Sequence, residues 1–143
     1  MFQLKLFSLL MVIAMSVVLS ILPSKGLDQL FVNVADFFSV TDILRQYNNS
    51  EITNVGHSLA MFVITLSALS VLPGRIFSIL LIAVSVSAGL EWLQSYVPSR
   101  TVSWYDFSYD LLGIGCALLV ISLLYLVKRL KSYFFPAPAT ASC

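Results

Sequence analysis

Charged side chains are scarce in this chain. Asp, Glu, Lys and Arg make up only 10% of its 143 residues, whereas a typical soluble domain has about 25%. Hydrophobic residues make up 59%, which is more than a soluble domain of this length can bury. The formal net charge is only +1, so no strong field attracts polyanions. The composition therefore excludes a disordered chain and a nucleic-acid-binding protein, and it indicates a surface that faces lipid.

Cysteine and histidine are also scarce. Cys116 lies inside an apolar run, and Cys143 is the last residue of the sequence. This placement excludes a disulfide scaffold and favours two free thiols, with Cys116 as a small residue of the core. The single histidine, His57, has no partner at a metal-ligand spacing along the chain. We therefore expect neither a metal nor a cofactor.

Long apolar runs are the main feature that is present. A helix needs about 17–25 mainly apolar residues to cross a bilayer. We predict an all-α, polytopic membrane protein whose four transmembrane helices are built on the segments Leu6–Leu22, His57–Leu72, Ile76–Leu93 and Leu111–Val127. The first segment could instead be a signal peptide, because Lys5 precedes it. Its length and the absence of a clean cleavage site favour a retained helix.

Between the first two apolar segments, hydrophobic residues recur at helical spacing. They are Leu27, Leu30, Phe31, Val34, Phe37 and Phe38, whereas Asp28, Asn33 and Asp36 lie elsewhere around the same helix. This pattern predicts an amphipathic helix that lies in the membrane interface.

The basic residues are distributed unevenly along the predicted bundle. One side carries five bases and no acid: Lys5, Arg75, Lys128, Arg129 and Lys131. The other side carries all seven acids with Lys25, Arg45 and Arg100. The positive-inside rule therefore predicts that both termini are cytoplasmic. We expect one membrane domain over residues 1–132 and a disordered, proline-containing cytoplasmic tail over residues 133–143.

Polar residues gather at the outer end of this predicted bundle. They are His57, Glu91, Gln94, Arg100, Asp106 and Asp110. Glu91 lies about 22 Å along its helix from Ile76, and Gln94 shares its face. We expect His57 and Asp110 at the outer starts of the second and fourth helices. Ionisable residues inside a membrane are costly, so these residues are candidates for a functional site.

Several of these residues also have a purely structural interpretation. Ser103 and Asp106 fit a capping box that begins the fourth helix. Arg100 could extend to lipid phosphate, and His57 could bridge to headgroups or water. Glu91 is harder to explain in this way, because a carboxylate below the interface needs a partner. We expect Arg100 to contact Glu91, Asp106 or Asp110.

Aromatic and small residues near this end favour packing and anchoring. The aromatic residues Trp92, Tyr96, Trp104 and Tyr105 are typical of an interfacial belt. The small residues Gly113, Gly115 and Ala117 are typical of close helix packing in a membrane.

The motifs at the outer end resemble those of the VanZ-like family. Glu91-Trp92-Leu93-Gln94 fits the family's E-x-x-Q, and Pro98-Ser99-Arg100 fits its P-x-R turn. Asp106, Asp110 and Gly113 fit its D-x-x-x-N-x-x-G helix start, with aspartate in place of the asparagine. The match covers about residues 54–120.

His57, ahead of an apolar segment, also resembles the histidine of that family, although Thr53-Asn54 stand where the family often has Asp-Lys. The resemblance implies a bacterial inner-membrane protein with four membrane helices. It also implies a role at the cell envelope, because the founding member is linked to resistance to the glycopeptide teicoplanin. The resemblance supplies no reaction.

Three functions are compatible with these residues. In the first, which we favour, Arg100 and His57 bind an anionic or sugar-bearing envelope lipid, or a lipid-linked precursor, at the outer face. In the second, polar contacts fix the helices, and the protein is a structural partner of another membrane protein in an envelope complex. In the third and least favoured, it is a small enzyme that uses Glu91, Asp110 and His57 as acid and base.

Overall fold

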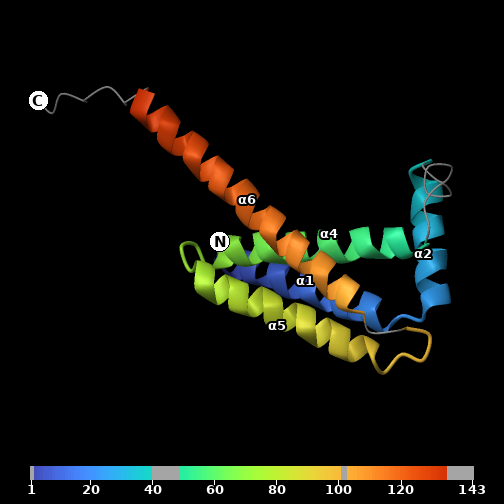
Figure 1. The fold of residues 1–143 in the computed structure, drawn as a ribbon. Helices are drawn as coiled ribbons and strands as arrows, with labels where there is room; N and C mark the ends of the chain where they lie inside the picture. Colours follow the sequence, from blue (N-terminus) through green and yellow to red (C-terminus); the bar gives the residue numbers. More distant parts are fainter. Residues whose placement is uncertain (1, 40–48, 101–102, 135–143) are drawn as a thin grey trace, which may run out of the picture.

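The structure is a computed structural model that describes residues 2–39, 49–100 and 103–134 (Figure 1). These residues form five helices and no strand: α1 (Phe2–Ile21), α2 (Ser24–Phe37), α4 (Asn49–Val71), α5 (Ile76–Gln94) and α6 (Trp104–Phe134). Within α1, α4, α5 and α6, the segments long and apolar enough to cross a membrane are Phe2–Ile21, Glu51–Val71, Ile76–Gln94 and Trp104–Phe134. The prediction of an all-α chain with four such helices is therefore confirmed.

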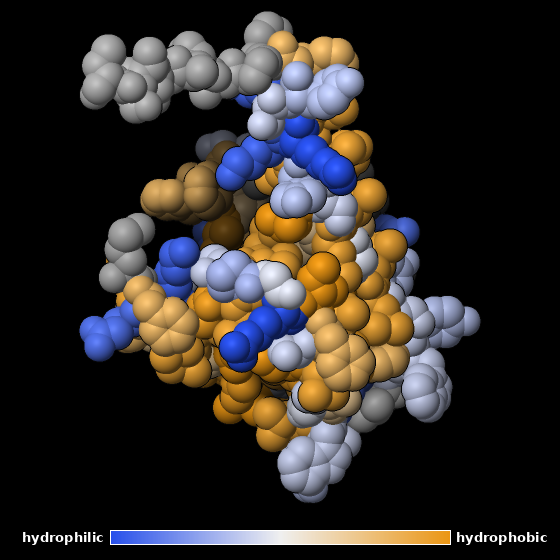
Figure 2. Space-filling model, turned by 90° about the vertical axis from the view of Figure 1, so that its left-hand side faces the viewer, coloured by the Kyte–Doolittle hydropathy of each residue, from blue (hydrophilic) through white to orange (hydrophobic). Residues whose placement is uncertain are grey.

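The four long helices run back and forth, so the N-terminus, the α4–α5 turn and the end of α6 all lie at one end of the bundle (Figure 1). All five predicted inner-side bases lie at this end. Figure 2 looks at the bundle from there and shows separate hydrophilic patches on a largely apolar surface. The uneven charge distribution predicted from the sequence is thus present in the fold, which holds the polar candidates at the opposite end.

The α2 helix stands across that opposite end, at a steep angle to the bundle (Figure 1). Leu27 and Ala35 are buried and Phe31 is half-buried, and their spacing of four residues places them on one face of the helix. Phe37 and Phe38 are exposed. The predicted helix between the first two membrane helices is therefore confirmed, but only part of its predicted apolar face packs on the bundle, because Leu30 and Val34 are exposed as well.

The bundle is held most closely where α4 crosses α6. A Cβ atom at Gly113 would overlap the backbone carbonyl of Ser58, so only glycine allows this approach. The hydroxyl of Ser58 donates a hydrogen bond to the carbonyl of Tyr109 at 2.7 Å, and Ala117, one turn after Gly113, is fully buried. Small residues that bring two backbones together are the usual basis of helix packing in membranes.

Two predictions for α6 are wrong. Gly115 has open space around it, so it does not take part in helix packing. Cys116 is exposed and not a residue of the core. Gly115 lies on the side of α6 opposite Gly113, and Cys116 lies on a flank, about 60° from Gly113 and about 100° from Ala117, because 3.6 residues make one helical turn. An apolar helix does not reveal from composition which of its sides faces protein and which faces lipid.

Two of the helices near the site, α4 and α6, begin earlier than the apolar runs that predicted them. Asn49 begins α4, so His57 lies two turns inside that helix and not at its start. Trp104 begins α6, so Asp110 also lies inside its helix. Polar first turns extend both helices beyond the segments that hydropathy detects.

The far end of α6 also extends beyond its prediction, because the helix continues to Phe134. Residues 133–134 are therefore helical, and the rest of the predicted tail, residues 135–143, lies outside the described part of the chain. Every residue from Leu119 to Phe134 is exposed, and this half of α6 projects past the other helices (Figure 1).

Candidate functional site

One buried carboxylate joins three helices at the polar end of the bundle. Asp110 of α6 is only 1% exposed. Its Oδ2 atom accepts a hydrogen bond of 2.6 Å from the Oγ of Ser87 on α5. Its Oδ1 atom lies 3.1 Å from Nδ1 of His57 on α4. Each oxygen of Asp110 therefore fixes a different neighbouring helix.

Glu91 of α5 lies beside this pair. Its Oε1 atom is 3.9 Å from the same Nδ1 of His57. The residue is 6% exposed, and neither carboxylate oxygen has a hydrogen-bond partner among the described residues. The backbone amide of Ser103 faces this carboxylate but stays outside hydrogen-bond geometry. Buried polar atoms without a partner are uncommon in native proteins, so Glu91 requires an explanation.

Three groups that can ligate a metal therefore meet in one place. One ligand atom from each of His57, Glu91 and Asp110 lies within 4.8 Å of the other two. The sequence shows no metal-ligand spacing, because the three residues come from three different helices. The only signal along the chain is that each helix places an ionisable residue near the same end.

Arg100 does not form the contact that we predicted. Its Nη2 donates to the carbonyl of Leu19 at 3.2 Å, and its Nε donates to that of Leu22 at 3.3 Å. Within the described residues, no ion pair joins Arg100 to Glu91, Asp106 or any other carboxylate. The last carbonyls of a helix lack partners within it, and the negative end of the helix dipole favours a cation. Arg100 therefore caps the C-terminal end of α1.

The electrostatic setting of Arg100 is mixed. Burial lowers the pKa of its guanidinium, while the carboxylates of Asp106, Asp28 and Glu91 act in the opposite direction. Because an arginine in a protein does not lose its proton, the side chain remains a cation. Two of its five N–H groups are used on α1, and the other donors remain for a ligand.

Asp106 is not one of the three residues of the buried cluster, although its charge acts on His57 and Glu91. The Oγ of Ser103 accepts a hydrogen bond of 3.1 Å from the backbone N–H of Tyr105, so Ser103 caps α6 as predicted. The reciprocal bond from the Asp106 side chain, which a complete capping box requires, is absent among the described residues. Asp106 is half-buried in the first turn of α6 and contributes charge near the site without a hydrogen bond of its side chain.

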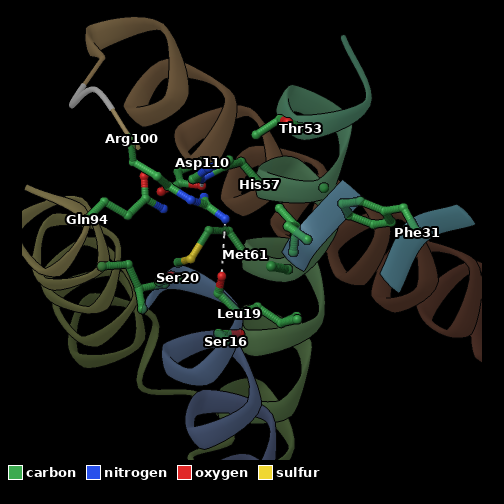
Figure 3. Close-up of a pocket in the computed structure, with 14 residues that line it drawn as sticks. Ser16, Leu19, Ser20, Phe31, Thr53, His57, Met61, Gln94, Arg100 and Asp110 are labelled. Carbon is green, nitrogen blue, oxygen red and sulfur yellow. Dashed lines mark hydrogen bonds and ion pairs between the residues drawn. The ribbon is translucent and has the colours of Figure 1, made fainter. Parts of the chain in front are cut away.

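A pocket opens beside the cluster (Figure 3). Its polar end is formed by four of the predicted residues: His57, Gln94, Arg100 and Asp110. Its walls are mainly apolar and come from α1, α2, α4 and α5: Leu19, Leu27, Phe31, Ala60, Met61 and Leu90. The pocket has a volume of about 90 Å³, which is smaller than the roughly 300–1,000 Å³ of a site for a drug-sized ligand, so it has room for only part of a headgroup.

The fold thus brings most of the predicted site residues together. His57, Glu91 and Asp110 form the buried cluster, and Gln94 and Arg100 lie on the adjoining pocket. Sequence reasoning missed Ser87, although it lies one helical turn before Glu91 on the same face.

The aromatic residues surround this end without entering the pocket. All four predicted belt residues are exposed, as an interfacial belt requires: Trp92, Tyr96, Trp104 and Tyr105.

The arrangement does not contain an activated serine. Ser87 donates to Asp110 and not to His57, so this serine is not paired with an imidazole base of the kind found in Ser–His nucleophiles. The chemistry available is therefore binding, proton transfer or metal ligation.

The chain matches no protein-family profile, no curated protein and no solved structure.

Proposed function

We propose that this chain is a VanZ-like membrane protein that binds an anionic or sugar-bearing envelope lipid, or a lipid-linked precursor. The observation that carries this proposal is the pocket itself, which joins apolar walls to a polar end that contains the half-buried cation of Arg100. A lipid likewise combines an apolar chain with a polar headgroup. Pockets with apolar linings and a few convergent polar groups are typical ligand sites.

The polar end suits a phosphorylated sugar. Arg100 has N–H donors beyond the two that cap α1, and a guanidinium binds phosphate through paired donors. Gln94, which is 2% exposed, adds an amide that can donate and accept. The carboxylate of Asp110 can accept hydrogen bonds from sugar hydroxyls. Cationic and anionic groups thus lie within one pocket and favour a headgroup that carries both phosphate and hydroxyls.

The apolar walls suit the lipid chain. Leu27 and Phe31 lie on α2, which crosses the end of the bundle (Figure 1). A lipid chain would rest against the half-buried side chains of Phe31 and Leu19. The exposed surface of the bundle is rich in large apolar side chains, so the bilayer would hold the remainder of the chain.

We assign the pocket to the outer face of a bacterial inner membrane, with both termini in the cytoplasm. The positive-inside rule supports this orientation, because the five bases lie at the end of the bundle opposite the pocket. The resemblance to VanZ-like proteins supports an envelope role and a contribution to glycopeptide tolerance. A lipid-linked cell-wall precursor bound at the outer leaflet would account for both the envelope role and the glycopeptide tolerance.

Two other functions each have an observation in their favour. Asp110 joins three helices and Arg100 caps a fourth, which suits a scaffold that presents the bundle to a membrane-protein partner. Glu91 is buried and has no hydrogen bond within the described part of the chain, which suits an acid or base beside His57. We favour binding because neither of these alternatives requires the apolar pocket.

The test is lipid binding by the purified full chain. Native mass spectrometry would compare a polyprenyl-phosphate-linked sugar, phosphatidylglycerol and phosphatidylcholine. We expect preferential retention of one of the first two lipids. Gln94→Leu should weaken that retention about tenfold, as expected for the loss of a hydrogen bond to a charged group.

The matched control is Gln29→Leu, the same change at an exposed position of α2. It should retain the lipid as the unaltered chain does. Equal retention of all three lipids, or equal retention by both glutamine variants, would overturn the proposal.

A further inference from the structure

We propose that His57, Glu91 and Asp110 bind one divalent transition-metal cation, Zn²⁺ or Mn²⁺, at the polar end of the pocket. The site goes beyond the proposed lipid binding and does not depend on it. It rests on three side chains from three helices whose ligand atoms lie within 4.8 Å of one another.

The spacing of the ligand atoms fits one ion. Bonds from zinc to nitrogen and oxygen are about 2.0–2.2 Å long, so two neighbouring ligands in a tetrahedral site lie roughly 3.4 Å apart. The observed separations from Nδ1 of His57 are 3.1 Å to Asp110 and 3.9 Å to Glu91. These two distances bracket the required value, so small side-chain movements would complete the coordination.

Glu91 provides the second, independent observation. It is more than nine-tenths buried, close to His57 and Asp110, and has no hydrogen-bond partner among the described residues. Two buried carboxylates face one imidazole, while Arg100 is hydrogen-bonded to α1. A divalent cation would balance both negative charges and would satisfy Glu91 at the same time. Removing charges from water is costly unless they are paired or bind a metal.

The surroundings hold the ligands in a suitable orientation. The hydrogen bond from Ser87 occupies Oδ2 of Asp110 and leaves Oδ1 facing His57. Partners that orient a ligating carboxylate in this way are a usual part of metal sites. Three protein ligands leave one coordination position open, and both His57 and Asp110 line the pocket. The open position would therefore face the pocket, as in sites where a metal meets water or a substrate.

The donor set selects the metal. One imidazole nitrogen with two carboxylates suits zinc or manganese. Calcium takes 6–8 oxygen ligands, and this cluster supplies only three side chains. No cysteine belongs to the cluster, so a site that requires thiolates is excluded among the described residues.

The test measures metal binding alone. The full chain would be purified in detergent with an affinity tag that contains no histidine, stripped with a chelator and titrated with ZnCl₂ or MnCl₂ by calorimetry. We expect one equivalent of one of the two metals. Glu91→Gln and His57→Gln should each weaken its binding about 100-fold. No lipid is present, so failed lipid binding and failed metal binding are separate results.

Asp110→Asn and Asp106→Asn form the matched pair, because they make the same change one turn apart on α6. The first should lose metal affinity about 100-fold and the second by less than threefold. The thermal midpoint provides a check on folding: the metal should raise it for the unaltered chain and for Asp106→Asn, but not for Glu91→Gln. Absence of a bound equivalent in the unaltered chain, or equal affinity in both aspartate variants, would overturn the proposal.

Discussion

The Oγ of Ser87 donates a hydrogen bond of 2.6 Å to Oδ2 of Asp110, and this bond joins α5 to α6 at the site where Asp110 also meets His57. Both residues are buried. Without Ser87, one oxygen of a fully buried carboxylate would lose its only donor among the described residues. This serine therefore supports the position of Asp110, although its hydroxyl donates to Asp110 and not to His57.

Ser87→Ala should lower the free energy of unfolding by about 1–3 kcal/mol, because it leaves a buried acceptor unsatisfied. Unfolding of the detergent-solubilised chain, followed by circular dichroism during denaturant titration, measures the change. Ser70→Ala is the control, since Ser70 is exposed and bonds only within its own helix. An equal effect of both substitutions would show that the bond to Asp110 contributes nothing.

The crossing of α4 and α6 yields a second prediction. Gly113→Ala places a methyl group against the carbonyl of Ser58, and the helices must separate. We expect a loss of about 1–3 kcal/mol, in line with other overpacked interiors. Gly115→Ala meets open space and should be neutral or stabilising by about 0.5–1 kcal/mol, because alanine favours a helix. The same denaturant titration compares the two variants, and equal values would contradict the close approach.

Arg100 yields a third prediction. Arg100→Gln removes the cation that caps α1, and we expect a loss of about 1–3 kcal/mol together with faster hydrogen exchange at the end of α1. Arg75→Gln is the control, since Arg75 is exposed at the opposite end of the bundle.

The contribution of Arg100 should also be constant between about pH 5 and 9, since burial lowers its pKa without removing the proton in this range. Hydrogen exchange that is unchanged at α1 in Arg100→Gln would argue against the cap.

The sequence predicted the bundle well because the length of an apolar run reports directly on a membrane helix. The same signal placed His57 and Asp110 at helix starts, which was wrong, because polar residues such as Ser103 begin a helix before its apolar part. The length of an apolar run also does not indicate which side of the helix faces the other helices and which side faces lipid. For this reason Cys116 was assigned to the core, although it is exposed.

The candidate site was predictable in part. Alternation of helix direction brings the outer ends together, so topology alone grouped Glu91 with His57 and Asp110. The hydrogen-bond partners were not predictable, because a shift of one helix along its neighbour by about one turn would bring different side chains together. Arg100 shows the difficulty: charge alone favours a carboxylate, but the fold places it beneath the unpaired carbonyls of α1. Every residue has a backbone carbonyl, so the sequence does not show which carbonyls lack a partner in the fold.

The orientation in the membrane provides a fourth prediction. With Cys116 and Cys143 replaced by serine, single cysteines would be introduced by Ser95→Cys and Ser132→Cys, both at exposed positions. An impermeant thiol reagent should label position 95 in intact cells and position 132 only after permeabilisation, because five bases lie at the end that holds Ser132. The reverse labelling pattern would invert the topology and place the pocket in the cytoplasmic leaflet.

The last prediction separates a site from a scaffold at Glu91. In a scaffold, this carboxylate would stabilise the bundle through His57, and removing one partner of a buried ion pair costs about 3–5 kcal/mol. The 3.9 Å separation argues against such a pair, and so does the absence of a hydrogen bond to Glu91 from residues 2–39, 49–100 and 103–134. Glu91→Gln keeps the shape of the side chain and removes a buried charge that repels Asp110.

We therefore expect Glu91→Gln, in chelator-treated protein, to unfold within about 1 kcal/mol of the unaltered chain or to be more stable. Asp110→Asn should instead lose stability, because its amide cannot accept from Ser87 and also pair with His57 as the carboxylate does. Denaturant titration of both variants, with and without added metal, distinguishes a scaffold role of Glu91 from a role in the site. A loss of several kcal/mol for Glu91→Gln without metal would assign Glu91 to the scaffold, whereas a loss confined to the metal-bound protein assigns it to the site.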